Sequence, residues 1–381
     1  MKASFLAKTA LATGLFAMAA IPAIAAEIDG VEDPIRVVKV RDGQPMVIGV
    51  YEVMSGPDTA LGLDQYRGIQ VAAEMTDNKI LGHPVRFLAE DTGCNAEGGQ
   101  TAATKIAANN QTILALGGAC SSATTPAAPI LWRAGVPDIG TSPSSPALTD
   151  PGRSKDFDGF LRTIYNDKWA GAKAATWAYE VQGYKNVATI HDGSPYAENL
   201  VRVFQKGFTE LGGTICSDEA ISPTDVDMQP VLTKIATCKP EMIYSPTFVS
   251  ATAYLLRQMQ GIDGLQDTVF LGSDASFGSQ LVESAGKDVI GFKITTTAQE
   301  AEALGDEYPV MREKYREMFG ENPIQGFHGN AFDAYMMAKA AIEDVAVQKD
   351  GATYIPIKAL RDRLYATKDF PGVTGQLTCD E

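Results

Sequence analysis

Histidine is scarce in this sequence of 381 residues, which contains 3 histidines and 5 cysteines. The cysteines form no C-x-x-C pair and no cluster with histidine, and no HExxH motif occurs, so a metal site has little support. A phosphate-binding P-loop and a GxSxG nucleophile motif are also missing. His83, His191 and His328 lie far apart, and we expect each to make a structural hydrogen bond. The sequence therefore predicts a protein without metal, cofactor or catalytic activity.

Basic residues are outnumbered as well. The 32 lysines and arginines face 47 acidic residues, which gives a formal net charge of -15. Nucleic acids and anionic lipid surfaces are bound through basic patches, so we expect neither as a partner.

Long apolar runs are lacking, and the N-terminus has the pattern of a secretory signal peptide. Lys2 and Lys8 form a positive start, residues 9–21 are apolar, and Ala-Ile-Ala at 23–25 is a small-x-small cleavage pattern. The apolar core is shorter than the ~20 residues that a membrane span needs. We expect residues 1–26 to be removed and the mature protein to be soluble, in the periplasm of a Gram-negative cell.

Export to an oxidising compartment permits disulfides. Cys94 and Cys120 follow two strands of one predicted parallel sheet, which we expect to be neighbours, so a Cys94–Cys120 bridge is predicted at that sheet edge. Cys216 and Cys238 flank one helical segment and are predicted to form a second bridge. Cys379 is left over.

Short apolar runs alternate with helical patterns from residue 45 onward. This alternation is typical of parallel sheets covered by helices on both faces, and it occurs in two successive runs. The sequence therefore predicts two doubly wound α/β domains, whereas residues 27–44 have the composition of a polar extension. The predicted strands of the two runs lie at 46–51, 84–89, 113–116 and 136–139, and at 186–190, 214–220, 242–245 and 269–272.

Hydroxyl side chains cluster directly after two successive predicted strands. The strand at 113–116 leads into a Gly-Gly pair and hydroxyls at 121–125, and the strand at 136–139 leads into hydroxyls at 141–145. Ligands of open α/β sheets bind at the carboxyl ends of the strands, and hydroxyls beside helix N-termini suit an anionic group. Helix capping by serine and threonine is the alternative for either loop alone. Two such loops together favour a small-molecule site for a carboxylate.

These loops belong to a series of short motifs that resembles the periplasmic leucine/isoleucine/valine-binding proteins, the type I solute receptors of ABC importers. The resemblance covers residues 45–381. Its motifs are MSGP at 54–57, YRG at 66–68, Asp91 with Cys94, GGACSS at 117–122, SPSSPALT at 142–149, FLRT at 160–163, His191-Asp192 with Tyr196, and GSD at 272–274.

The family implies two Rossmann-like lobes joined by a hinge that closes on the ligand. The resemblance places residues 45–165 and 298–381 in the N-terminal lobe and 166–297 in the C-terminal lobe. The family pattern continues beyond 375–381 with another strand pair. We therefore expect this sequence to be a fragment or a shortened member, and a missing partner beyond residue 381 would explain why the number of cysteines is odd, with Cys379 as the fifth.

The resemblance also implies the binding residues. Ser121, Ser142 and Ser144 would hold the carboxylate of a ligand, and Asp274 would hold its ammonium group, since burying an unpaired ammonium is costly. A loop acid that caps a helix is the alternative role for Asp274.

Four further positions concern the ligand side chain. Tyr196 and Phe248 match aromatic residues of the family's cleft, with an exposed helix-start tyrosine and a core phenylalanine as alternatives. Leu61 stands where branched-chain binders usually carry an aromatic residue, and Trp169 stands where many relatives carry an acid or amide. These two departures leave open another amino acid, or an aromatic or aliphatic acid, as the ligand.

The sequence thus predicts a monomeric, non-catalytic solute-binding protein that presents a branched-chain or other aliphatic amino acid to the permease subunits of an ABC importer. Two alternatives remain open at this point. A ligand sensor would pass the closed state to a signalling partner, and an exported α/β enzyme would act on the bound molecule.

Overall fold

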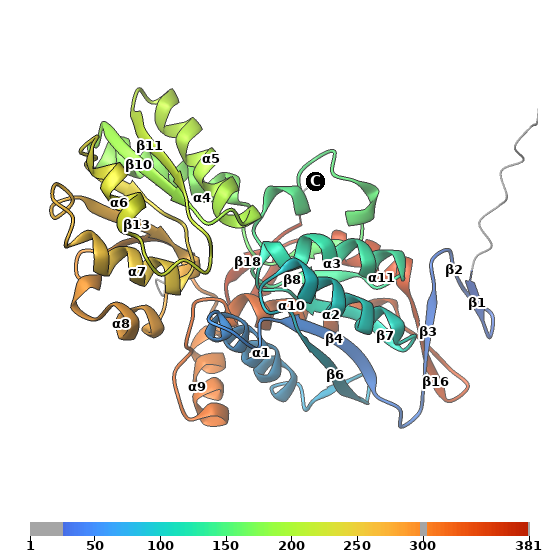
Figure 1. The fold of residues 1–381 in the computed structure, drawn as a ribbon. Helices are drawn as coiled ribbons and strands as arrows, with labels where there is room; N and C mark the ends of the chain where they lie inside the picture. The colour runs from blue at the N-terminus through green and yellow to red at the C-terminus, as the bar shows by residue number, and fades with distance from the viewer. Residues whose placement is uncertain (1–25, 298–302, 380–381) are drawn as a thin grey trace, which may run out of the picture.

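The computed structural model describes residues 26–297 and 303–379. The chain forms two α/β lobes that lie side by side (Figure 1). The predicted signal peptide falls, except for its last residue, outside the described residues. Within the described ranges, no helix combines the length and apolar character that crossing a membrane requires.

The first lobe is built on a six-stranded sheet in which five strands are parallel and β5 is antiparallel to β6. All seven residues of the central strand β4, MVIGVYE, are buried, as expected for a strand covered on both faces. Across the sheet the strands are β5 (Lys79–Ile80), β6 (His83–Asp91), β4 (Met46–Glu52), β7 (Thr112–Gly117), β8 (Asp138–Gly140) and β9 (Phe160–Arg162).

Helices cover both faces of this sheet. Helices α2 (Ala96–Ala108) and α3 (Ser121–Arg133) pack on one face through alanine, leucine and isoleucine side chains. The other face is covered by α1 (Thr59–Glu74), α10 (His328–Val345) and α11 (Ile357–Tyr365), with α9 (Tyr308–Phe319) packed beside them. The C-terminal part of the chain thus returns to the first lobe and completes its core.

The second lobe has a five-stranded, fully parallel sheet. Helices α4 and α5 pack on one face, and α6, α7 and α8 pack on the other. The strands across the sheet are β11 (Thr214–Ala220), β10 (Asn186–His191), β12 (Met242–Tyr244), β13 (Val269–Ser273) and β14 (Lys293–Thr295). The helices are α4 (Asp167–Thr176), α5 (Pro195–Glu210), α6 (Gln229–Ala236), α7 (Val249–Met259) and α8 (Ser279–Ala285).

Residues 27–44 are not the polar extension that their composition suggested. They form β1 (Ala26–Ile28), β2 (Val31–Asp33) and β3 (Val37–Arg41), and β3 pairs with β16 (Ala352–Pro356), which pairs in turn with β15 (Val347–Lys349). The pairing partner is some 310 residues away, beyond the reach of local pattern. A hairpin of β17 (Phe370–Gly372) and β18 (Gly375–Leu377) follows α11.

Both predicted disulfides are present. Cys94 and Cys120 are bridged with their Cα atoms 5.4 Å apart, and Cys216 and Cys238 with theirs 6.0 Å apart. One detail of the prediction is wrong, because β4 lies between β6 and β7 and the two strands preceding the first bridge are not neighbours. The loop after β6 spans this gap, with Cys94 itself in a left-handed backbone conformation.

Candidate functional site

A small pocket lies where the carboxyl ends of the two sheets face each other. Both lobes contribute to its walls. Polar groups lie at its two ends, and apolar side chains line the space between them. The lining residues are Leu61, Ala119, Cys120, Ser121, Ser142 and Phe327 of the first lobe, and Tyr196, Phe248, Asp274 and Ala275 of the second.

The hydroxyl-rich end comes from the loops after β7 and β8, which pair in parallel and deliver both loops to one sheet edge, as predicted. Ser121 Oγ accepts a hydrogen bond from Ser145 N at 3.1 Å, so its own hydrogen remains free to be donated to a ligand. Ser142 Oγ lies 2.9 Å from the Ala119 carbonyl and 3.1 Å from Gln65 Oε1. Helix α3 begins at Ser121, so the positive end of its dipole also faces this end of the pocket.

The acidic end is Asp274, which directly follows β13 and is only 4% exposed. Tyr196 Oη donates to Asp274 Oδ1 at 2.5 Å, and Tyr165 Oη donates to Oδ2. Burial raises the pKa of Asp274, while the two phenol groups act in the opposite direction. Within the described residues no lysine or arginine is paired with this carboxyl group. It can therefore accept a cation from a ligand.

The apolar walls lie between these two ends. Leu61 and Phe327 contribute from the first lobe, and Phe248 contributes from the second. The Phe248 ring contacts the Tyr196 ring at a centroid distance of 5.6 Å. These side chains are suited to hydrocarbon or to an aromatic ring.

Not every predicted residue lines this pocket. Ser144 is buried next to it, and its carbonyl accepts a hydrogen bond from Asp167 N at 3.0 Å. The Trp169 side chain is 69% exposed and belongs to a different hollow beside the hinge. Conversely, the sequence analysis missed Phe327, which lies in no motif, and it gave residue 165 only as the boundary between the predicted lobes.

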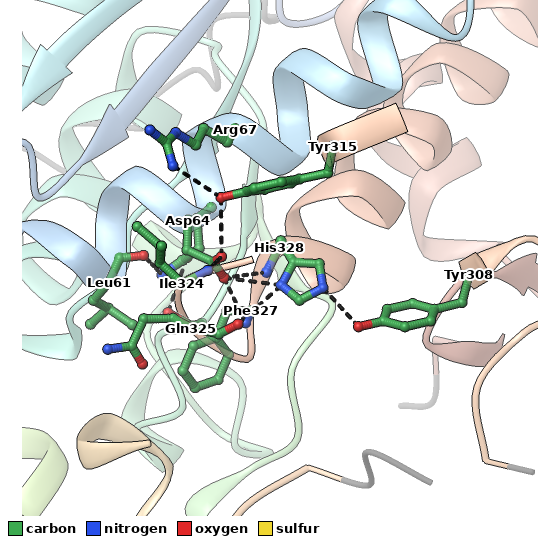
Figure 2. Close-up of polar contacts among 11 residues, drawn as sticks. Leu61, Asp64, Arg67, Tyr308, Tyr315, Ile324, Gln325, Phe327 and His328 are labelled. Carbon is green, nitrogen blue, oxygen red and sulfur yellow. Dashed lines mark hydrogen bonds and ion pairs between the residues drawn. The ribbon is translucent and has the colours of Figure 1, made fainter. Parts of the chain in front are cut away.

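A polar network holds the two apolar residues of the first lobe in place (Figure 2). The buried Asp64 of α1 accepts hydrogen bonds from the backbone N–H groups of Ile324, Phe327 and His328, at 2.8–3.1 Å. It thus caps the N-terminus of α10, which lacks a capping side chain of its own. His328 Nδ1 also lies 3.2 Å from this carboxylate. Asp64 thereby ties the α1 turn that carries Leu61 to the loop that carries Phe327.

The lobes touch across the cleft, so the pocket is closed. Asn199 Nδ2 of the second lobe donates to Ser145 Oγ of the first at 3.2 Å, and Gln280 Nε2 donates to the Pro57 carbonyl at 3.3 Å. Asp58 of the first lobe faces Asp192 of the second. Burial, with the charge of Asp192 as the smaller cause, raises the pKa of Asp58 to about 6.

Comparisons with known proteins agree with this architecture. A sequence model of the periplasmic binding protein family matches residues 45–380. The chain is 26% identical to the Leu/Ile/Val-binding protein BraC3 of Rhizobium johnstonii, over 88% of each protein, and 25% identical to an amino acid binding protein of Pseudomonas aeruginosa, over 81% of this chain and 79% of that one. The crystal structure of a leucine-binding protein from Thermotoga maritima superposes with a TM-score of 0.78 at 26% identity, covering 88% of this chain and 91% of the other.

Proposed function

Because this chain belongs to the periplasmic binding protein family, we propose that it binds an aliphatic amino acid between its lobes and presents it to an ABC importer. The observation that carries this proposal is the pocket itself, in which serine hydroxyls lie at one end and the buried Asp274 carboxyl group at the other. Among the described residues, no lysine or arginine is paired with this carboxyl group. A zwitterion is the small molecule whose two charges match these two ends.

The carboxylate of the ligand binds at the serine end. Ser121 has a hydroxyl hydrogen to donate, and Ser142 and Ser144 belong to the adjoining loop. Hydroxyls, backbone N–H groups and a helix N-terminus satisfy a carboxylate without a basic residue. This agrees with the absence of lysine and arginine from 117–122 and 141–146.

The ammonium group binds Asp274, and the aliphatic side chain packs on Leu61, Phe248 and Phe327. An ammonium group cannot be buried at low cost without an acceptor that carries charge. The names of the similar proteins, which include leucine-binding and Leu/Ile/Val-binding proteins, support a branched aliphatic side chain.

Binding works by lobe closure. A ligand shifts the open–closed equilibrium only by the contacts that it makes in the closed state alone. Here the serine end belongs to the first lobe and Asp274 to the second, so one zwitterion holds both lobes together. The closed form is then the species that a permease recognises in the periplasm.

An aromatic or other carboxylic acid without an amine is the second candidate, because three aromatic rings, those of Tyr196, Phe248 and Phe327, line the pocket. Mass spectrometry of the ligand released on denaturing the purified protein, followed by calorimetry with amino acids and their deaminated analogues, tests the two. A best ligand without an amine would refute the amino-acid proposal and leave a carboxylate-binding protein. Transport and sensing are then separated by uptake assays in cells lacking the gene.

A further inference from the structure

Two acids of the first lobe, Glu52 and Asp138, are buried beside the serine loops without a basic partner. Glu52 is the last residue of β4 and Asp138 the first of β8, and they are 0% and 1% exposed. Among the described residues neither forms an ion pair with a lysine, arginine or histidine. One oxygen of each carboxyl group also lacks a hydrogen-bond partner within the described part of the chain. Burying an ionised carboxylate in this way is very costly, so both groups are expected to be neutral.

Glu52 begins a chain of hydrogen bonds that leads to the pocket. Thr141 Oγ1 lies 2.8 Å from Glu52 Oε1 and is also hydrogen-bonded to Gln65 Oε1. Gln65 Oε1 lies 3.1 Å from Ser142 Oγ, and Gln65 Nε2 donates to the Leu61 carbonyl at 3.1 Å. Ser142 and Leu61 both line the pocket. The chain thus ties the loop after β8 to α1, which are two walls of the pocket.

Counting hydrogens places a proton on Glu52. The Thr141 hydroxyl has one hydrogen to donate, but it contacts two oxygens, those of Glu52 and Gln65. Gln65 Oε1 is a carbonyl oxygen and cannot donate. Exchanging the oxygen and nitrogen of this amide would set its oxygen against the Leu61 carbonyl, 3.1 Å away. Both contacts therefore contain a hydrogen only if Thr141 donates to Gln65 and Glu52, as a carboxylic acid, donates to Thr141.

The surroundings of Glu52 favour this protonated form. Burial raises the pKa of Glu52 well above its usual range, the hydrogen bond with Thr141 acts against this rise, and the charge of Asp138 adds to it. Burial also raises the pKa of Asp138, although Tyr51 Oη donates to Asp138 Oδ2 at 2.5 Å and opposes the rise. The pKa of Tyr51 itself is raised, chiefly by burial, so the phenol stays a donor. At pH 7 the cluster of Glu52, Asp138 and Tyr51 is therefore neutral.

We propose that Glu52 is a protonated positioning residue of the binding site, which holds the serine loop after β8 against α1 by donating its proton to Thr141. This inference rests on the proposed function. An ionised Glu52 would take the Thr141 hydrogen, and Gln65 Oε1 would then face an oxygen without a hydrogen. The loop that carries Ser142 would lose its tie to α1. Because this tie acts on the hydroxyl-rich end of the pocket, it should affect amino acids and other carboxylic acids alike.

Two variants of similar length separate the donated hydrogen from the acid. Glu52→Gln keeps a donor and cannot ionise, whereas Glu52→Met removes the donor. Glu32→Gln, at an exposed position of β2, is the matched control. Calorimetry at pH 6 with leucine and with isocaproate, its deaminated analogue, measures the affinities. Urea denaturation of the ligand-free proteins at pH 5, 6 and 7 measures the unfolding equilibrium constants.

The binding arm tests the positioning role. Glu52→Gln and Glu32→Gln should stay within about twofold of wild type for the probe that wild type binds. Glu52→Met should bind about tenfold more weakly, the loss for a buried acceptor left without its donor. Wild-type affinity in Glu52→Met, or the same loss in Glu52→Gln as in Glu52→Met, would overturn the positioning role.

The stability arm tests the proton without any ligand. In the unfolded chain Glu52 ionises above its ordinary pKa of about 4.3, whereas in the folded protein it stays protonated. The unfolding equilibrium constant of wild type should therefore rise relative to that of Glu52→Gln by about tenfold per pH unit between pH 5 and pH 7, while its ratio to that of Glu32→Gln stays constant. A constant ratio for Glu52→Gln would show an ionised Glu52 and overturn this inference alone. Failure of wild type to bind either probe would overturn the proposed function and the positioning role with it.

Discussion

Replacing Asp274 tests the charge that the second lobe offers to the ligand. In Asp274→Asn the side chain keeps its shape and an oxygen that accepts from a phenol, but the negative charge is lost. Removing one partner of a buried, hydrogen-bonded charge pair costs about 2–5 kcal/mol. At ~1.4 kcal/mol per tenfold change, amino-acid affinity should fall by about 30-fold or more.

The fold should tolerate this change. Tyr196 keeps a second partner in Ser273 Oγ at 2.6 Å, and the asparagine oxygen still accepts from Tyr165. Burial of Asp274 raises its pKa, so the ionised acid is itself destabilised in the ligand-free pocket and its loss relieves that cost. We therefore expect the free energy of unfolding without ligand to change by less than ~1 kcal/mol.

Isothermal titration calorimetry with the ligand recovered from the native protein measures the affinities, and urea denaturation measures the stability. Asp263→Asn, an exposed acid of the same lobe, is the control and should bind like wild type. Unchanged or improved binding by Asp274→Asn would refute the ammonium assignment and favour a ligand without an amine.

Three further predictions concern stability and closure. Asp64→Ala should lower the free energy of unfolding by about 3 kcal/mol, because three backbone N–H groups lose their acceptor at ~1 kcal/mol each. Urea denaturation measures this change, and a loss under ~1 kcal/mol would contradict the capping role. In the double variant Cys94→Ser/Cys120→Ser, the free energy of unfolding should fall by roughly 3–4 kcal/mol, the loop-closure value for a sequence separation of 26. Free thiols at both positions in the oxidised wild-type protein would remove the basis of this expectation. Burial, with the charge of Asp192 as the smaller cause, raises the pKa of Asp58 to about 6 in this form, and we expect a lower pKa in an open form in which Asp58 is hydrated and distant from Asp192. The closed form should then lose stability as the pH rises through about 6, so ligand-free protein should have a smaller radius of gyration by X-ray scattering at pH 5 than at pH 7, and Asp58→Asn should stay compact at pH 7. The same radius in all three samples would refute this link between Asp58 and closure.

Local pattern was sufficient for the fold class and for predicting that the two serine-rich loops meet at one sheet edge. Predicted strands of four to seven residues, separated by helical periodicity, indicated two parallel sheets, and parallel strands must deliver their following loops to one edge. Ser121 and Ser142 meet for this reason. The two disulfides were predictable because each joins segments separated by only 26 and 22 residues.

What the sequence did not reveal depends on contacts between distant segments. The cap that Asp64 provides for α10 joins residues about 260 positions apart, and it includes the backbone N–H of Phe327, whose side chain lines the pocket. Tyr165 follows no strand or helix pattern, yet the hinge places its hydroxyl on Asp274. The two carboxyl oxygens of Asp167 are buried without a hydrogen-bond partner among the described residues, which depends on their surroundings, since an aspartate at a helix start is ordinary in sequence.

Under the proposed function, the distribution of the site over the two lobes would determine which ligands can close the cleft. The first lobe supplies the hydroxyl-rich end with Leu61 and Phe327, and the second supplies Asp274, Tyr196 and Phe248. A molecule with only a carboxylate would bind the hydroxyl-rich end of the first lobe and offer no positive charge to Asp274. An amine without a carboxylate would bind Asp274 and leave the hydroxyl-rich end without an anionic partner. Neither gains polar contacts on both lobes, and a ligand shifts the equilibrium only by its differential affinity for the closed state. Under the proposed function, closure would therefore act as a filter for zwitterions, and the apolar side chains between the two ends would select among them by shape.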